Sequence, residues 1–159
     1  MNSNTKTYGE YEVTLDSKGR IMLPAGLKKQ VPDSECEEVF MICKGPEKFI
    51  TLYTQSQWKR VEAFIDRIND FNEEGEELKS YLVSATPIEL DSAGRIVIPK
   101  RMLTKASISK DIMIHGMKDK IAIWDATEYD EFREGIDQDR VKQLKSKILG
   151  TDHLNPLLG

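Results

Sequence analysis

The same ten-residue phrase occurs twice in this chain of 159 residues. It reads LDSKGRIMLP at residues 15–24 and LDSAGRIVIP at residues 90–99, and seven of the ten positions are identical. Lys18 against Ala93 is a change of chemical type, whereas the other two differences exchange one apolar residue for another. Identity of this degree within one chain predicts a tandem duplication of a single structural unit.

The duplication extends beyond the phrase. Residues 40–58, FMICKGPEKFITLYTQSQW, align with residues 111–129, DIMIHGMKDKIAIWDATEY, when Gly45 is matched to Gly116. Apolar positions then coincide along both segments. The two phrases are 75 residues apart and the two glycines 71, so the first copy holds four additional residues, which we place in VPDSECEE.

Both copies predict the same order of elements. A strand enters a tight turn, SKG or SAG, and a second strand follows, which Pro24 or Pro99 ends because proline cannot donate to a β-ladder. A short helix comes next, and two further strands form a hairpin whose turn contains Gly45 or Gly116. A helix closes each copy. The predicted fold class is therefore α+β and mainly β.

These elements divide the chain into four segments. We expect a first repeat at residues 8–54, a connecting helix at 55–82, a second repeat at 83–126, and a C-terminal helix with a flexible tail at 127–159.

Apolar residues recur at spacings of three and four in both closing helices, which predicts one apolar face on each. The residues concerned are Trp58, Val61, Phe64, Ile65, Ile68 and Phe71 in the first helix, and Val141, Leu144 and Ile148 in the last. We interpret these stripes as core or subunit contacts rather than a cofactor site. Gly75, within NEEGEE, is expected to break or kink the first helix.

Charge is distributed unevenly along the chain, whose formal net charge is −4. Residues 1–31 carry five Lys or Arg against three Asp or Glu, and residues 86–110 carry five against two. The repeated segments are thus basic islands in an acidic chain, and a local field matters more to an anionic partner than the total charge does. Charge alone leaves ordinary scatter open as an explanation.

Several classes of protein are disfavoured. No stretch approaches the roughly 18–20 apolar residues that a membrane span needs, and the N-terminus MNSNTKTYGEYE lacks a signal-peptide core, so we expect a cytoplasmic protein. Cys36 and Cys43 have no second ligand pair nearby, which predicts reduced thiols without a metal or other cofactor. His115 and His153 fit no nucleophile–base or metal pattern, so we do not expect an enzyme.

The repeated turn places an aspartate four residues before an arginine. Asp16 can accept backbone hydrogen bonds across the turn and can also reach Arg20, while Gly19 supplies a backbone conformation that other residues avoid. Such a pair can simply staple a hairpin, which contributes about 0–1 kcal/mol when exposed. It can also present an oriented arginine to phosphate or to a base edge. Retention of the motif in both copies favours the second use.

The paired turns, the hairpins of the form GxxxxIxIW and the opening aromatic and glycine residues of YGEY resemble the MraZ family of bacterial transcriptional regulators. This family belongs to the wider SpoVT-AbrB-like swapped-hairpin group, and the resemblance covers roughly residues 8–132. It implies a double-split β-barrel built from both repeats in one chain. It also implies a ring-like homo-oligomer, an octamer or larger, that binds double-stranded DNA at direct repeats upstream of the division and cell wall gene cluster. The resemblance further implies repression and a location in the cytoplasm and nucleoid.

The resemblance and the flanking charges assign roles to individual residues. The residues expected to contact DNA are Arg20, Arg95, Lys18, Lys28, Lys100 and Arg101. The residues expected to orient the motif are Asp16, Asp91, Gly19 and Gly94. Gly26 stands where family members often have another basic residue, and Lys100 stands where they often have a second proline. Operator preference and affinity are therefore expected to differ from those of other family members.

Oligomerisation is expected to be required for tight binding. A monomer with two or three guanidinium contacts binds DNA weakly at physiological salt, because the log–log salt slope is roughly −0.9 per neutralised phosphate. Several subunits that present the same loops about 34–36 Å apart, one DNA turn, would bind as a multivalent reader. The alternative function is an antitoxin-like or scaffold protein-interaction module without specific DNA readout.

Overall fold

The protein consists of two units in a computed structural model, which describes residues 5–150. The first unit ends at Ala126, and the second begins at Thr127 and contains most of α6 (Ala126–Glu134) and all of α7 (Gln138–Leu149). The expected flexible tail at residues 151–159, with His153, lies outside the described residues, as do the first four residues.

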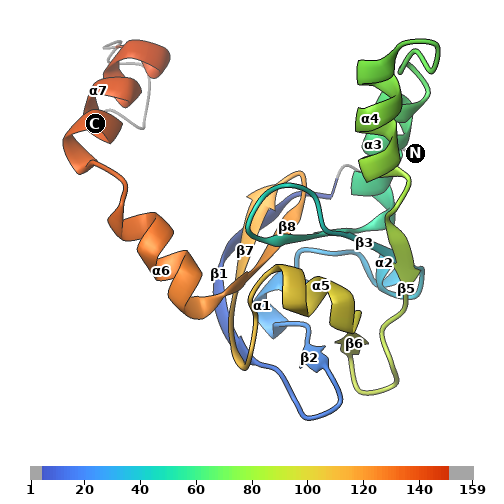
Figure 1. Ribbon diagram of the computed structural model, residues 1–159. Coiled ribbons are helices and arrows are strands. Elements are labelled where there is room, and N and C mark those ends of the chain that lie inside the picture. The colour runs from blue at the N-terminus through green and yellow to red at the C-terminus, as the bar shows by residue number, and fades with distance from the viewer. Residues whose placement is uncertain (1–4, 151–159) are drawn as a thin grey trace. The chain divides into compact units, whose positions relative to one another are not determined.

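Six strands of the first unit form an antiparallel sheet in the order β1-β7-β8-β4-β3-β5 (Figure 1). Their bounds are β1 (Thr7–Thr14), β3 (Phe40–Cys43), β4 (Ile50–Tyr53), β5 (Thr86–Ile88), β7 (Asp111–Lys118) and β8 (Ile121–Asp125). Two short strands, β2 (Arg20–Met22) and β6 (Arg95–Val97), pair separately as a two-stranded ribbon. The α+β class with two tandem repeats is confirmed. The strand pairing of the described residues leaves the larger sheet open at β1 and β5 rather than closing it into a barrel.

The two repeats are interleaved. The first strand of each repeat pairs with the third strand of the other, since β1 pairs with β7 and β5 with β3. The pairs β2–β6 and β4–β8 also cross between the repeats, whereas β3–β4 and β7–β8 are hairpins within a repeat. One repeat alone would expose unpaired strand edges, so the repeats stabilise each other as a single folding unit.

The core of the first unit is a cluster of branched aliphatic side chains. Ile21 and Ile96 lie directly opposite each other in the ribbon and are 1% and 0% exposed. Helix α1 (Ala25–Lys28) buries Leu27 against this cluster, and α5 (Lys100–Lys105) buries Leu103, which lies one position further along its repeat than Leu27 does. Pro24 and Pro99 follow the ribbon strands and occupy the N-cap positions of these two helices, which agrees with the preference of proline for helix starts.

The connecting segment forms two helices rather than one. Helix α3 (Gln55–Ile65) starts with a capping box between Thr54 and Gln57, and α4 (Glu73–Leu82) starts after Asn72. The break therefore lies at residues 66–72 and not at Gly75. The N–H of Gly75 donates to Asn72 Oδ1 at 2.6 Å, so this glycine lies within the first turn that Asn72 caps.

The prediction that Gly116 lies in a hairpin turn is wrong, although Gly45 does lie between β3 and β4. Gly116 is part of β7, where it pairs with Gly9 of β1 and Ile121 of β8. A Cβ atom at Gly116 would lie 2.6 Å from Tyr8 N. The close approach of β1 therefore requires this glycine.

Helix α2 (Asp33–Cys36) occupies the additional segment of the first copy and was not predicted. It contributes Glu35, which is 5% exposed. The carboxylate accepts hydrogen bonds from the Thr5 hydroxyl and from the backbone N–H of Ser56, the latter at 2.6 Å. Burial raises the pKa of Glu35, but these hydrogen bonds outweigh burial and hold the pKa below its ordinary value. Glu35 thus ties the N-terminal segment, α2 and α3 together.

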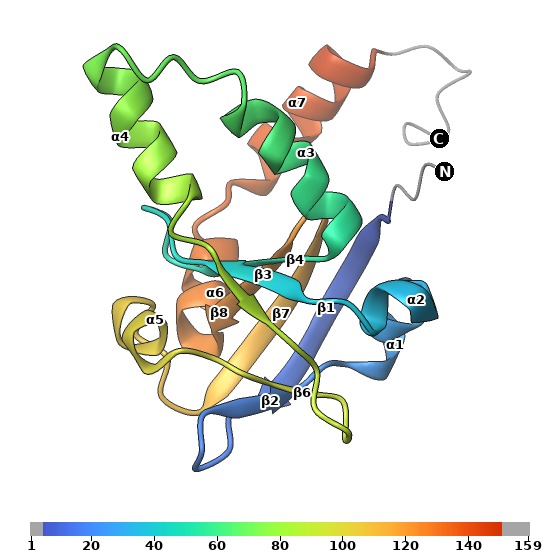
Figure 2. The same cartoon turned by 90° about the vertical axis from the view of Figure 1, so that its right-hand side faces the viewer.

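The loops that precede β2 and β6 lie at one end of the first unit, and α3 and α4 lie at the opposite end (Figure 1 and Figure 2). The two copies of the repeated phrase are therefore brought to the same end of the molecule.

Candidate nucleic-acid interface

Asp16 organises the first motif loop, residues 16–20. Its Oδ1 accepts the backbone N–H groups of Lys18 and Arg20, both at 2.9 Å, and its Oδ2 accepts Arg20 Nε at 2.7 Å. Gly19 has a φ of +77°, in the region that favours glycine, and its N–H donates to the Asp16 carbonyl at 3.1 Å. One carboxylate thus holds both the turn and the direction of the guanidinium group.

The second motif loop, residues 91–95, has the same arrangement. Asp91 Oδ1 accepts the backbone N–H groups of Ala93 and Arg95 at 2.9 Å, and Oδ2 accepts Arg95 Nε at 2.9 Å. Gly94 has a φ of +82°, and its N–H donates to the Asp91 carbonyl at 2.9 Å. The aspartate–arginine contact expected from the sequence is therefore present in both loops.

Both aspartates are held in their ionised form. The backbone hydrogen bond from Arg20 is the largest cause that lowers the pKa of Asp16 to about 2. The equivalent bond from Arg95 lowers the pKa of Asp91. Each arginine accordingly keeps its carboxylate partner at neutral pH.

Each loop is braced by the other repeat. The N–H of Ile98, which follows β6, donates to the Gly19 carbonyl at 2.9 Å, and the N–H of Leu23, which follows β2, donates to the Gly94 carbonyl at 3.1 Å. Together with the β2–β6 pairing, these bonds position the two loops as a pair.

The ribbon presents both arginines on one face. Arg20 lies opposite Val97, and Met22 lies opposite Arg95. Because side chains alternate along a strand, these four residues share the face opposite to the buried isoleucines. Met22 is 48% exposed and Val97 is 55% exposed. Met22 and Val97 were not predicted as residues of the site, although the alternation of side chains around Ile21 and Ile96 in each phrase indicates this face.

The remaining predicted cations lie in three places. Lys18 is exposed in the first turn, and Lys100 and Arg101 are exposed in the first turn of α5. Lys28, at the end of α1, lies beside the second loop: a Cβ atom at Gly94 would be 3.5 Å from its Nζ. Arg101 lines a separate cavity that two further basic residues share, Lys44 and Lys105.

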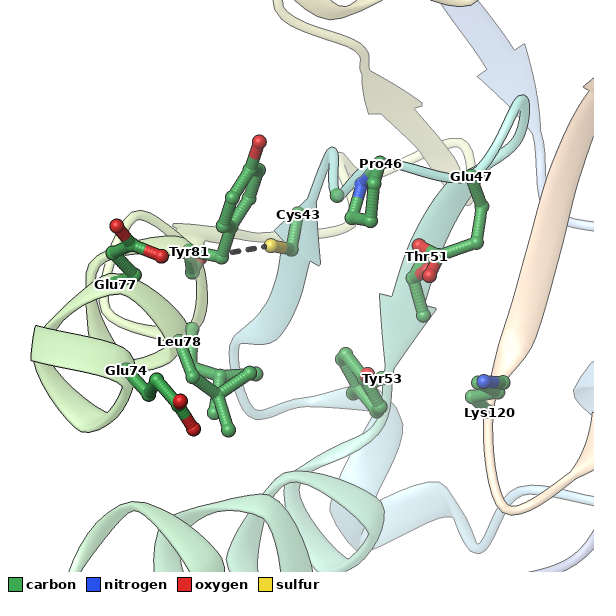
Figure 3. Close-up of a pocket in the computed structure, with 12 residues that line it drawn as sticks. Cys43, Pro46, Glu47, Thr51, Tyr53, Glu74, Glu77, Leu78, Tyr81 and Lys120 are labelled. Carbon is green, nitrogen blue, oxygen red and sulfur yellow. Dashed lines mark hydrogen bonds between the residues drawn. The ribbon is translucent and has the colours of Figure 1, made fainter. Parts of the chain in front are cut away.

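A different cavity, of about 460 Å³, lies between the β3–β4 hairpin and α4 (Figure 3). Tyr53 lines it, and burial raises the pKa of Tyr53 to about 12. The Cys43 thiol donates to the Tyr81 carbonyl at 3.4 Å at the same wall. The charged lining residues are three carboxylates and one ammonium group, Glu47, Glu74, Glu77 and Lys120. This excess of negative charge does not suit a phosphate group.

Within residues 5–150, no group of three or more His, Cys, Asp or Glu side chains is placed to hold a metal ion. No helix in that part of the chain is both long and apolar enough to cross a membrane. Cys36 and Cys43 are free thiols.

The fold and the candidate site together define a class: α+β proteins made of two interleaved repeats, each of which contributes one motif loop with an oriented arginine. The family model described as "MraZ protein, putative antitoxin-like" matches residues 7–80 and again residues 81–149. The chain therefore belongs to the MraZ family.

Curated relatives agree with this membership. The chain is 36% identical over 125 residues to the transcriptional regulator MraZ of Cytophaga hutchinsonii, a match that covers 78% of this chain and 82% of the relative. It is 29% identical over 130 residues to the protein of the same name from a Thermoanaerobacter species, covering 81% and 87%. It is also 29% identical over 143 residues to that of a Marinomonas species, covering 89% and 95%. By class, the chain is a transcriptional regulator.

Proposed function

We propose that the chain binds double-stranded DNA at direct repeats in a promoter, through its two motif loops, and represses the division and cell wall gene cluster. The observation that carries this proposal is that Arg20 and Arg95 share the outward face of one ribbon, each oriented by its own aspartate. Oriented guanidinium groups on a common face suit bidentate recognition of guanine or phosphate.

A two-stranded ribbon has suitable dimensions for the major groove, which is about 12 Å wide. Side chains that lie diagonally across a ladder are about 7–8 Å apart, close to two base-pair steps of about 3.4 Å each. Arg20 and Arg95 therefore have the spacing to reach nearby base pairs. Met22 and Val97, between them, offer apolar contacts of the kind that thymine methyl groups accept.

We assign the other predicted cations, three lysines and one arginine, to the DNA backbone. Lys18, Lys28, Lys100 and Arg101 are all exposed, and flexible cations of this kind hold phosphates without reading sequence. These contacts set the register of the protein on DNA, and the ribbon face supplies specificity.

We also propose that the protein acts as a homo-oligomer, a ring of eight or more subunits. Two helices leave apolar side chains exposed, with Leu78 of α4 54% and Ile148 of α7 73% exposed. The helices also differ in charge: α4 carries Glu73, Glu74, Glu76 and Glu77 against Lys79, whereas α7 carries Arg140, Lys142, Lys145 and Lys147 against Asp139. Complementary charge around exposed apolar residues suits a heterologous contact between copies, the kind that generates rings.

The test is fluorescence-anisotropy binding to the DNA directly upstream of the protein's own gene and to a scrambled duplex, over a salt series. We expect salt-sensitive preference for the upstream DNA, and loss of that preference in Arg20→Ala plus Arg95→Ala without a change in oligomer size. Lys59→Ala plus Arg67→Ala removes two exposed cations outside the loops, one in α3 and one just after its end, and should retain the preference. A correctly assembled oligomer that binds neither duplex would instead favour the protein-interaction alternative.

A further inference from the structure

We infer that the two motif loops are not equivalent on DNA, and that Lys28 of the first repeat supplies the phosphate contact of the second loop while neighbouring carboxylates restrain that loop. This inference deepens the proposed function and rests on it. It assigns Lys28 to Arg95 rather than to Arg20, although Lys28 and Arg20 belong to the same repeat.

The surroundings of the two motif glycines carry this assignment. A Cβ atom at Gly94 would lie 3.5 Å from Lys28 Nζ, whereas one at Gly19 would lie 4.0 Å from Leu103 Cδ1. Lys28 and Leu103 are 75 residues apart, the same separation as the two phrases, so they are equivalent positions of the two repeats. The interleaved fold thus places Lys28 of the first repeat against the second loop, and Leu103 of the second repeat against the first loop. At this position the second loop is contacted by a cation, and the first loop by a buried leucine.

The loops also differ in the cations that they carry themselves. The first loop has Lys18, and the second has Ala93 at the equivalent position. Lys28 therefore restores to the second loop the lysine that its own sequence lacks. Each loop presents one arginine and one lysine, but the second loop takes its lysine from a different element.

Carboxylates line a cavity beside the second loop. The cavity has a volume of about 530 Å³, and Lys28 is the one basic residue among those that line it. Its acidic lining residues outside the motif are Asp33, Glu37, Glu38 and Glu89. Helix α2 and the residues that follow it supply the first three, and the second repeat has no helix equivalent to α2.

The charge of Lys28 acts on the Cys36 thiol, which lines the same cavity. Burial raises the pKa of the Cys36 thiol, and the Lys28 ammonium opposes that rise. The carboxylates repel any phosphate that approaches, and Lys28 is the cation at this cavity that opposes the repulsion. This repulsion acts on any duplex whatever its sequence, so it weakens DNA binding in general and leaves the choice between sequences to the base contacts of Arg95.

The first experiment compares Lys28→Met with Lys29→Met, its exposed neighbour, in binding of the oligomer to the upstream duplex. We expect Lys28→Met to weaken binding roughly 3- to 10-fold and to reduce the salt slope by about 0.9, the contribution of one phosphate. Lys29→Met should change binding less than twofold, and Lys28→Arg should retain wild-type binding. The effect of Lys28→Met should persist in an Arg20→Ala background and disappear in an Arg95→Ala background, because coupled residues are non-additive.

The second experiment neutralises the carboxylates with Glu37→Gln plus Glu38→Gln. We expect tighter binding to both the upstream and the scrambled duplex than in the wild type, and recovery of the binding lost in Lys28→Met. Melting curves and oligomer size establish that each variant is folded. An effect of Lys28→Met that disappears in Arg20→Ala instead, or unchanged scrambled-duplex binding after neutralisation, would overturn the inference while the proposed function stands. Absence of wild-type binding to either duplex would overturn both.

Discussion

Arg20 and Asp16 are joined twice: the backbone N–H of Arg20 donates to Asp16 Oδ1 at 2.9 Å, and its Nε donates to Oδ2 at 2.7 Å. Their side chains are 24% and 34% exposed. Ion pairs this accessible to water contribute little to stability. The contact therefore matters chiefly for the direction in which it holds the guanidinium group.

Asp16→Asn should separate the turn from the orientation of the arginine. The asparagine Oδ1 can still accept the two backbone N–H groups, but its Nδ2 cannot accept from Arg20 Nε. We expect a melting temperature within a few degrees of the wild type and roughly a tenfold loss of affinity for the upstream duplex, which corresponds to about 1.4 kcal/mol. Anisotropy and thermal melts measure the two effects.

Asp130→Asn, an exposed change on α6, is the matched control and should alter neither quantity. A large fall in melting temperature for Asp16→Asn with unchanged DNA affinity would show that the motif is only a hairpin staple.

The motif glycines should be sensitive to alanine. Gly19 and Gly94 have φ values of +77° and +82°, and a Cβ atom in that region costs about 1–2 kcal/mol. We therefore expect Gly19→Ala and Gly94→Ala each to lower the free energy of unfolding by about that amount. Urea denaturation measures it.

Gly135→Ala is the control for this pair, because an added Cβ there meets no atom closer than 3.4 Å and its φ is not in the left-handed region. Equal destabilisation by all three substitutions would contradict the assignment of strain to the motif loops.

The repeated phrase predicted the fold class and the local geometry of the site. The turns of Asp16 and Asp91, the short helices after Pro24 and Pro99 and the two within-repeat hairpins all follow from local signals. Local signals could not reveal that strands pair between repeats, because β1 carries the same pattern whether its partner is β2 or β7. The position of Gly116 was mispredicted for this reason, since its requirement for glycine comes from β1.

The neighbours of the motif depend on the same interleaving. Lys28 is eight residues from Arg20 in the chain, yet it lies against Gly94. The pattern of one repeat assigns Lys28 to its own loop, and only the pairing of β2 with β6 moves it to the other. Helix α2 lies in the segment that has no counterpart in the second copy, so comparison of the two copies could not predict it. Carboxylates of α2 and of the residues after it line the cavity beside the second loop together with Lys28.

Glu35 should be required for stability rather than for DNA binding. Glu35→Ala leaves the Thr5 hydroxyl and the Ser56 N–H without their acceptor, and each buried unsatisfied group costs about 1–3 kcal/mol. We expect a loss of roughly 2–4 kcal/mol in the free energy of unfolding, measured by urea denaturation at pH 7.

The pH dependence of stability tests the same carboxylate. Because the folded protein holds the pKa of Glu35 below its ordinary value of 4.5, its stabilising contribution is present above that pH and is lost as the pH falls below it. Glu35→Gln should therefore flatten the decline in stability of the wild type on the acid side. Parallel acid profiles for the two proteins would show that Glu35 is not held ionised by its partners.

Ile96 should couple the stability of the ribbon to the use of both loops. It is fully buried opposite Ile21, and truncation of such a side chain costs about 2–5 kcal/mol. Because β6 braces the first loop through the Ile98 N–H, we expect Ile96→Ala to weaken DNA contacts made by Arg20 as well as those made by Arg95.

The matched control is Ile123→Ala, an equally buried residue in β8 of the larger sheet. The two variants should lose similar stability, but Ile96→Ala alone should lose DNA affinity at a temperature where both are fully folded. Equal losses of affinity would mean that the loops depend on the stability of the whole unit and not on the ribbon that joins them.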